Sequence, residues 1–318
     1  MTNSTHNKLT SYFISKNIHP LFILGTWIFG GHNFGKYNQE DALKTLDFAY
    51  KNAIRSFDIA SFYSKGNSNK VLAKFLRKKN RNDYILCAKA GLKWNKNTVI
   101  FDGSATNINL EIESLLNQFQ TNYIDTYLLH WPDPKIKLEE SLESIVKLKE
   151  KKKVNFIGIC NVDINNLKKV KQFNLDTIHI HNNLIKNKKQ KEFVTKIKEN
   201  FHTTIFSIFE NGLLTNPKYL NLELIGKKDI RRKNEIHKNK KQKEKLTQLF
   251  SKNTAEYTTA ECVLIWSLKN LNFDSIIIGP KNYIQIKSIL DICKNQKKIN
   301  NIIKTDFYNF LNTFQFND

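Results

Sequence analysis

The sequence predicts an α/β fold of the (β/α)8 or TIM-barrel class, with a long loop after the seventh strand and an extra helix at the C-terminus. Short apolar runs alternate with longer amphipathic runs along the whole chain, and the alternation occurs eight times. Strands that alternate with helical patterns indicate a parallel sheet with crossover helices. Eight such pairs are the number that closes a barrel.

The short apolar runs are the expected strands. They are Phe22–Gly25, Ile54–Asp58, Tyr84–Lys89, Tyr123–His130, Val154–Ile159, Thr177–His181, Thr203–Ser207 and Ser275–Ile278. The longer runs repeat apolar residues with helical spacing. They are Glu40–Asn52, Asn67–Lys79, Ile108–Asn117, Leu138–Lys152, Ile164–Phe173, Lys188–Asn200, Thr258–Leu271 and Ile284–Cys293, and Ile299–Phe314 is expected as the extra helix. Asn107 or Thr106 is expected to cap the third helix, and Asp163 the fifth.

Length and composition fit one barrel domain over residues 1–318, in which 299–318 carries the extra helix. Such barrels commonly run to about 250 residues or more, and no Ser/Gly/Pro-rich stretch divides this chain. A polar insertion at 218–255 does not fit the repeat. A loop of this length is usually functional or disordered. It is either a lid-like loop or a solvated charge run with a helix around Lys243–Lys252.

The formal charge of +22 raises the question of a nucleic-acid or anionic-surface partner. Lysine is spread over many helical stretches and occurs with abundant Asn and Ile, which indicates a bias of the coding sequence. The aromatic–basic interleaving typical of RNA-binding proteins is lacking. We therefore expect no nucleic-acid partner, although a basic binder of anionic surfaces remains a less favoured alternative.

Four cysteines, Cys87, Cys160, Cys262 and Cys293, are widely spaced, and no Cys-x-x-Cys or Cys/His cluster accompanies them. This pattern argues against a metal site. The polar N-terminus carries no apolar signal segment, and no window approaches about 18 uninterrupted apolar residues. The expectation is a cytoplasmic protein without a membrane partner, either a monomer or a homo-oligomer.

Four polar residues, Asp58, Tyr63, Lys89 and His130, fall at or just past the ends of three successive predicted strands. Active sites of such barrels form at the carboxyl ends of the strands. A phenol has a pKa of about 10, which a neighbouring ammonium lowers, so Tyr63 beside Lys89 is a candidate general acid. Asp58 would hold Lys89 in place, and His130 would orient a carbonyl. None of these groups supplies hydride, so a cofactor must.

Seven stretches of the chain resemble the aldo-keto reductases, in the family's order and over nearly the whole chain. They are Leu24–Gly31, Phe57–Ser64, Ala88–Gly91, Leu128–Pro134, Ile157–Asn161, Asn211–Thr215 and Ile277–Pro280. The resemblance implies an NAD(P)H-dependent oxidoreductase that reduces an aldehyde or ketone to an alcohol, or catalyses the reverse reaction, with Tyr63 as the proton donor.

The resemblance also implies a nicotinamide dinucleotide extended across the barrel mouth, NADPH in preference with NADH as the alternative. No Gly-x-Gly-x-x-Gly motif follows the first strand, so this is no Rossmann site. The residues that the resemblance places around the cofactor are Thr26, Trp27, Asp58, Cys160, Asn161, His179, Phe206, Ser207, Phe209, Gly279, Lys281 and Gln285. Asp229–Arg231 resembles part of a loop that covers the cofactor, and Lys281 would pair with a 2′-phosphate.

Several positions depart from the family's pattern. Cys160 stands where serine is usual, His179 where glutamine is usual, and Phe206 where tyrosine is usual; Ser288 and Ile289 replace an acidic–Asn pair. These departures leave open a barrel that binds cofactor as a sensor or regulatory subunit with little turnover.

The remaining candidates lie on the substrate side. His32 is a weaker candidate there, and His181 and His202 are interpreted as strand or surface residues. Trp27, Phe29, Trp94 and Trp131 are positioned to wall a pocket for an apolar or sugar-like carbonyl compound.

Overall fold

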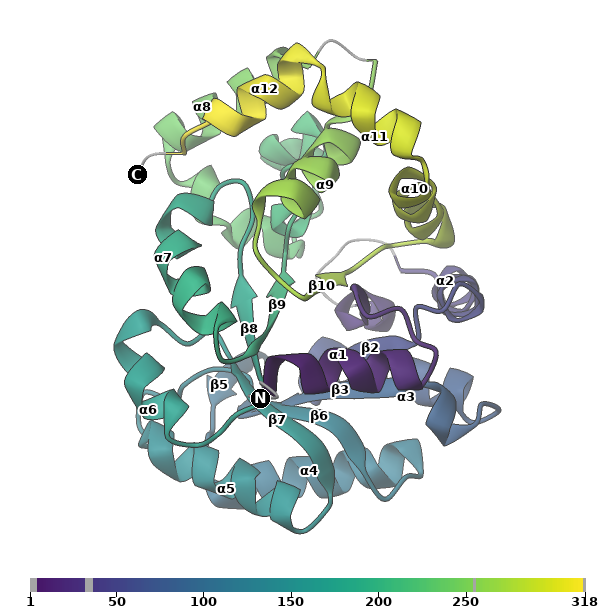
Figure 1. The fold of residues 1–318 in the computed structure, drawn as a ribbon, viewed down its shortest axis with the longest axis vertical. Helices are drawn as coiled ribbons and strands as arrows, with labels where there is room; N and C mark the ends of the chain where they lie inside the picture. Colours follow the sequence, from purple (N-terminus) through teal and green to yellow (C-terminus); the bar gives the residue numbers. More distant parts are fainter. Residues whose placement is uncertain (1–4, 32–36, 254–255, 317–318) are drawn as a thin grey trace.

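Eight parallel strands close into a barrel in the order β1-β10-β9-β8-β7-β6-β3-β2, with helices around it (Figure 1). The computed structural model describes residues 5–31, 37–253 and 256–316. The strands are β1 (Phe22–Gly25), β2 (Ser56–Ala60), β3 (Ile85–Ala90), β6 (Ile124–Leu129), β7 (Val154–Cys160), β8 (Thr177–His181), β9 (His202–Phe206) and β10 (Ser275–Ile278). The predicted fold class is therefore confirmed.

Each of the eight predicted helices is present. They are α2 (Gln39–Lys51), α3 (Asn67–Leu76), α4 (Ala105–Phe119), α5 (Leu138–Glu150), α6 (Leu167–Lys171, after the turn η4, Ile164–Asn166), α7 (Asn187–Lys198), α9 (Thr259–Asn270) and α10 (Tyr283–Lys294). Ser104, rather than Asn107 or Thr106, caps α4 by accepting the Asn107 N–H. Asp163 caps η4 as predicted. No described helix combines the length and apolar character that crossing a membrane requires.

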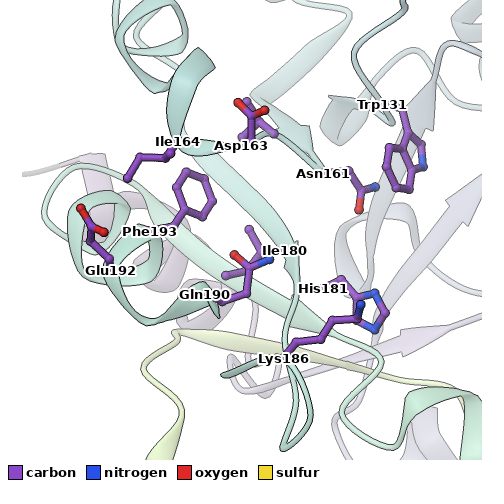
Figure 2. A pocket seen from close by; sticks show the side chains of 11 residues that line it. Trp131, Asn161, Asp163, Ile164, Ile180, His181, Lys186, Gln190, Glu192 and Phe193 are labelled. Atoms are coloured by element: carbon purple, nitrogen blue, oxygen red, sulfur yellow. The ribbon is translucent and has the colours of Figure 1, made fainter. Parts of the chain in front are cut away.

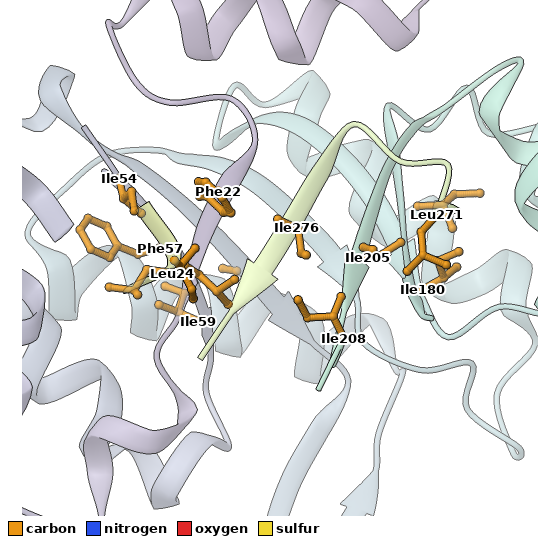
Figure 3. Packing of buried hydrophobic residues seen from close by; sticks show 14 of the residues in the cluster. Phe22, Leu24, Ile54, Phe57, Ile59, Ile180, Ile205, Ile208, Leu271 and Ile276 are labelled. Carbon is orange, nitrogen blue, oxygen red and sulfur yellow. The ribbon is translucent and has the colours of Figure 1, made fainter. Parts of the chain in front are cut away.

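The main hydrophobic core lies between the barrel wall and the helices. Leu24, Phe57, Ile205 and Ile276 of successive strands belong to one cluster of fully buried side chains (Figure 3). The helix residues of that cluster include Leu115, Leu142 and Ile145. Alternate strand residues thus face the helices, and the residues between them point into the barrel.

A helix that the sequence interpretation missed, α1 (Thr5–Ser15), covers the end of the barrel where the strands begin (Figure 1). Leu9 and Phe13 are one helical turn apart and pack with Ile23 and Ile85 from the beginning of β1 and β3. Tyr12 donates a hydrogen bond to Asp125 at 2.6 Å. The apolar stripe of α1 therefore fills the barrel at this end.

A two-stranded hairpin, β4 (Leu92–Asn95) and β5 (Thr98–Phe101), was also missed; it follows β3. Its turn contains Lys96 at φ 53°. The indole N–H of Trp94 donates to the Phe62 carbonyl at 2.7 Å. This bond fixes the hairpin beside the residues that precede Tyr63.

The polar insertion is folded rather than structureless over its described residues. It forms four short turns, η6 (Pro217–Leu220), η7 (Leu222–Leu224), η8 (Ile230–Lys233) and η9 (Glu235–His237), and then α8 (Lys240–Ser251). Side chains of Asn216, Asn221, Asp229 and Asn234 each accept a backbone N–H at the start of a turn. Such local bonds order a chain that has little apolar surface to bury. The helix expected around Lys243–Lys252 is α8, and residues 254–255 lie outside the described residues.

The prediction of one helix over Ile299–Phe314 is wrong. The segment forms α11 (Gln296–Ile303) and α12 (Asp306–Thr313). Thr305 ends the continuity, because its hydroxyl accepts the Tyr308 N–H at 3.1 Å and begins a new helix. The Tyr308 hydroxyl then accepts a hydrogen bond from Asn270 at 3.2 Å, which joins α12 to α9.

Glu111 of α4 is a buried carboxyl group behind the barrel wall. It accepts hydrogen bonds from the Gly91 N–H at 3.2 Å and from Asn107 at 2.7 Å. Burial raises the pKa of Glu111 from 4.5 to about 7, against these bonds. The native state therefore holds a proton that the unfolded chain releases at lower pH. The stability from this proton is complete below pH 4.5 and is lost as the pH rises to about 7.

Glu111→Gln places a neutral amide where the protonated carboxyl group lies, so the loss of stability at high pH should disappear. The change in the free energy of unfolding caused by the substitution should be more favourable at pH 8 than at pH 4, by at most about 3 kcal/mol. Urea unfolding at the two pH values measures the difference. Glu113→Gln, on the exposed side of the same helix, is the control and should show no such difference. An equal effect of Glu111→Gln at both pH values would contradict the interpretation.

Candidate active site

Three strands bring the four predicted catalytic residues to the barrel interior. Asp58 lies inside β2, two residues before its end, whereas the sequence placed it at the strand end. Tyr63 opens the turn η2 (Tyr63–Gly66) after β2, Lys89 is the penultimate residue of β3, and His130 directly follows β6. Because β2, β3 and β6 are neighbours in the barrel, these side chains meet at one mouth.

Tyr63, Lys89 and Asp58 form a closed triangle of hydrogen bonds. The Lys89 ammonium donates to the Tyr63 hydroxyl at 3.1 Å and forms an ion pair with Asp58. The Tyr63 hydroxyl donates to Asp58 Oδ2 at 3.1 Å. All three residues are buried, with 3–6% of their surface exposed. In such surroundings each charge depends on its partner, since water cannot replace it.

The proton remains on the phenol in this arrangement. Burial and the Asp58 carboxylate raise the pKa of Tyr63, and Lys89 opposes them. Burial lowers the pKa of Lys89, but Asp58 and Tyr63 outweigh it and hold the pKa well above its usual range. Lys89 therefore lowers the pKa of Tyr63 as expected, but burial and Asp58 raise it by more. The site holds a neutral phenol beside a charged ammonium.

His130 is a neutral imidazole at the same mouth. Burial, followed by the charges of Lys89 and His179, lowers the pKa of His130 well below 6.5. Its ring lies 6.0 Å from the Tyr63 ring, edge to face. Its Nδ1 finds no hydrogen-bond partner within the described part of the chain. A neutral ring can donate or accept a hydrogen bond without adding charge.

The position of the Tyr63 ring is fixed by its neighbours. Trp27 stacks on it with 5.5 Å between ring centroids and 7° between planes. The hydroxyls of Ser64 and Ser68 both donate to the Trp27 carbonyl, at 2.9 and 3.0 Å. Gly30 leaves room for this packing, because a Cβ there would lie 2.1 Å from the Ser64 Cβ.

The expected cofactor residues are divided between the mouth and the barrel interior. Asn161 lies at the mouth, where its side chain donates to the His130 carbonyl at 3.0 Å. Cys160 and His179 are fully buried, and Nδ1 of His179 has no partner among the described residues. Thr26 is also buried, and its hydroxyl donates to the Asp58 carbonyl at 2.8 Å. This hydroxyl is therefore committed to the barrel wall rather than directed to a ligand.

A potential metal cluster inside the barrel does not have suitable donors. Ligand atoms of Asp58, Cys87 and His179 lie within 4.8 Å of one another. Asp58 is already paired with the Lys89 ammonium. Burial, followed by Asp58, raises the pKa of the Cys87 thiol well above 9.0, so the thiolate that a metal requires is disfavoured.

Basic side chains gather where the insertion approaches the end of β10. Arg231 pairs with Asp229 at 2.5 Å and lies over the Tyr219 ring at 4.0 Å. Burial lowers the pKa of Lys281, and the nearby charge of Arg231 adds to this effect. Gln285 accepts the Lys281 N–H at 2.7 Å. Gly279 borders open space, because a Cβ there would meet no atom within 4 Å.

The sequence interpretation missed a pair formed by the partly buried His181 and the buried Glu210. Glu210 is 5% exposed, has φ 46°, and lies 2.8 Å from His181 Nε2. It also accepts hydrogen bonds from Asn183 at 2.6 Å and from Asn234 of the insertion at 2.8 Å. His181 stacks on Phe206 with 5.4 Å between centroids. The available signal was an acid shortly after an apolar strand; the pairing itself joins residues far apart in the chain.

The remaining residues singled out in the sequence lie in different parts of the chain. Ser207, next to Phe206, adopts φ 63°, and Phe209 packs partly buried against the core. His202 lies at the other end of the barrel, where it hydrogen-bonds Ser275 at 2.9 Å. His32 lies outside the described residues.

Comparison with known proteins gives the family of the chain. The family model "Aldo/keto reductase family" matches residues 22–306. The chain is 26% identical over 295 residues to the aldo-keto reductase YhdN of Bacillus subtilis, covering 88% of this chain and 89% of that protein. It is 26% identical over 209 residues to the NADH-specific methylglyoxal reductase of Escherichia coli, covering 60% and 64%.

A solved structure shows the same fold. The glycerol dehydrogenase AKR11B4 from Gluconobacter oxydans superposes with a TM-score of 0.72 at 23% identity, covering 89% of this chain and 90% of that one. The chain belongs to the aldo/keto reductase family. It is thus an oxidoreductase of a family whose activity is NAD(P)H-dependent carbonyl reduction.

Proposed function

We propose that this chain reduces an aldehyde or ketone, or oxidises the corresponding alcohol, with Tyr63 as the proton donor. The observation that carries the proposal is the buried triangle in which the Tyr63 hydroxyl meets the Lys89 ammonium and the Asp58 carboxylate, each at 3.1 Å from it. A raised pKa keeps this phenol protonated at neutral pH. When the carbonyl carbon accepts hydride, the carbonyl oxygen needs such a proton donor.

Each residue has a proposed part in the proton transfer. Tyr63 gives its proton to the substrate oxygen, and the ammonium of Lys89 stabilises the phenolate that remains. Asp58 keeps Lys89 charged and in position. His130, which is neutral, orients the carbonyl by a hydrogen bond without repelling Lys89. In the oxidative direction the Tyr63 phenolate, stabilised by the Lys89 ammonium, accepts the proton from the alcohol.

A nicotinamide cofactor supplies the hydride when it is bound. The structure offers groups that suit it: Nδ1 of His179, which no described residue hydrogen-bonds, the amide of Asn161 and the basic cluster around Lys281. We propose that the cofactor is held by Trp27, Asp58, Cys160, Asn161, His179, Phe206, Ser207, Phe209, Gly279, Lys281 and Gln285. Arg231 adds positive charge, although Asp229 already neutralises part of it.

NADPH is the cofactor that we expect to be preferred. Lys281 precedes α10, whose first N–H groups and positive dipole end also attract an anion. Lysine acts as a point charge, so its preference should be modest and sensitive to salt. We expect Lys281→Ala to weaken NADPH binding about two- to fivefold and NADH binding hardly at all, as measured by fluorescence titration.

Lys287→Ala, an exposed position on the same helix, is the matched control and should leave both affinities unchanged. Equal wild-type affinity for the two cofactors, or no loss of NADPH binding without Lys281, would show that a 2′-phosphate is not recognised here. The name of the Escherichia coli relative makes NADH the alternative.

A carbonyl screen that follows NADPH and NADH absorbance tests the proposed activity. Methylglyoxal belongs in the screen, because a relative is named for its reduction. Cofactor binding without turnover of any carbonyl compound would favour the sensor or regulatory alternative, which the departures at Cys160, His179 and Phe206 support. Salt-sensitive oligonucleotide binding that excludes cofactor would instead favour the basic-surface alternative.

A further inference from the structure

A pocket of about 420 Å³ lies near the four candidate catalytic residues, between the loop that follows β7 and the start of α7 (Figure 2). Trp131 and Asn161 form one end, and Ile164 and Phe193 form the other. Nothing in the proton-transfer chemistry uses the far end.

The near end of this pocket adjoins the segment that carries His130. Trp131 directly follows His130 in the chain. Asn161 lines the pocket and donates to the His130 carbonyl at 3.0 Å. His181, on the same wall, is held by Glu210 at 2.8 Å. The near end of the pocket is therefore the neighbouring cavity for a ligand whose reactive end meets His130.

The wall of the pocket is largely apolar. Val162, Ile180 and Phe193 are buried side chains that line it. Trp131 and Ile164 stand at its edges with 43% and 38% of their surface exposed, so the pocket offers apolar surface at both ends.

The charged side chains that line the pocket are one base, Lys186, and two acids, Asp163 and Glu192. Lys186 lines it and has no carboxylate partner within the described part of the chain. The two acids of the lining are engaged elsewhere: Asp163 accepts the Asn166 N–H at 3.0 Å, and Glu192 pairs with Lys196 at 2.6 Å. Because both carboxylates have partners, the Lys186 ammonium is the group of this lining that an anionic ligand could use.

We propose that this pocket is a second substrate subsite, which takes the apolar distal part of a carbonyl substrate that ends in a carboxylate. The apolar chain lies against Trp131, Ile164 and Phe193, and it turns back so that the carboxylate pairs with Lys186, which lies beside His181 (Figure 2). This proposal rests on the proposed function, because it assumes that the carbonyl of the same substrate reacts at Tyr63.

The kinetic test compares three aldehydes with the whole protein and its preferred cofactor: benzaldehyde, 4-(4-formylphenoxy)butanoate, and the methyl ester of the latter. Ile164→Ala should lower kcat/KM about three- to tenfold for the two long aldehydes. Lys186→Ala should lower it about two- to fivefold for the carboxylate alone. Neither change should affect benzaldehyde. Ile14→Ala and Lys8→Ala on α1, at the other end of the barrel, are the matched controls.

A binding test separates this proposal from the proposed function. The unreactive probe 4-phenoxybutanoate should change the fluorescence of Trp131, and Trp131→Phe should abolish that change. Lys186→Ala should weaken the probe about two- to fivefold. This result would stand even if no aldehyde were turned over, in which case only the proposed function would fail.

The opposite results overturn the subsite. Turnover of all three aldehydes with equal effects of Ile164→Ala on each would mean that the pocket is not used by substrate. Absence of a Trp131 response to millimolar probe, or a response that Lys186→Ala leaves unchanged, would mean that the pocket does not bind a carboxylate.

Discussion

Tyr63→Phe should lower kcat for carbonyl reduction by roughly 10²–10⁴-fold, the usual effect of losing a positioned general acid. The substituted side chain keeps its aromatic ring and so the stack on Trp27, and the shape of the mouth should be preserved. Lys89 and Asp58 would still pair with each other. Cofactor affinity, measured by fluorescence titration, should therefore remain nearly unchanged while steady-state turnover falls.

Tyr127→Phe is the matched control for that experiment. Tyr127 is a fully buried tyrosine whose hydroxyl donates to the Ile108 carbonyl at 3.1 Å, on the helix side of the barrel wall. The protein with Tyr127→Phe should lose about 1 kcal/mol of folding stability and should keep its turnover. Full activity of Tyr63→Phe would show that another group donates the proton.

Lys89→Met should remove both turnover and stability. Without the ammonium, no positive charge stabilises the phenolate of Tyr63, so turnover should fall at least about 100-fold. Asp58 would also remain buried and unpaired, and breaking a buried ion pair in this way typically costs about 3–5 kcal/mol. Steady-state kinetics and urea unfolding measure the two effects separately.

The double substitution Asp58→Asn and Lys89→Met tells the two effects apart. With both charges gone, most of the lost stability should return, because no uncompensated charge stays buried. Turnover should stay low, since the phenol still lacks its cation. Recovery of turnover together with stability would mean that Lys89 acts only by holding the fold, and the proposed role in proton transfer would be wrong.

The barrel could be predicted because its signal is repeated. Each strand and helix is recognisable within about ten residues, and eight repeats leave few other arrangements. Strand ends were less certain: Asp58 was expected at a strand end and lies two residues inside β2. This error did not affect the prediction of the four candidate catalytic residues, because residues near the carboxyl ends of adjacent strands meet even when a strand ends two residues later than expected.

What could not be predicted depends on contacts between distant residues. His181 and Glu210 are 29 positions apart, and neither shows by itself that the other is its partner. The break between α11 and α12 depends on whether Thr305 caps a helix or continues one, and both are compatible with its sequence. The apolar stripe of α1 was visible in Leu9 and Phe13, but its partners lie inside the barrel.

The packing of α1 into the barrel has a consequence for the order of events during turnover. Leu9 and Phe13 occupy the end where the strands begin. Cofactor and substrate would then both enter and leave through the opposite mouth of the barrel. When two ligands use the same mouth, the ligand that lies deeper has to bind first and dissociate last. A cofactor held by the proposed residues below the carbonyl compound would therefore have to bind first, and we expect a compulsory order of binding.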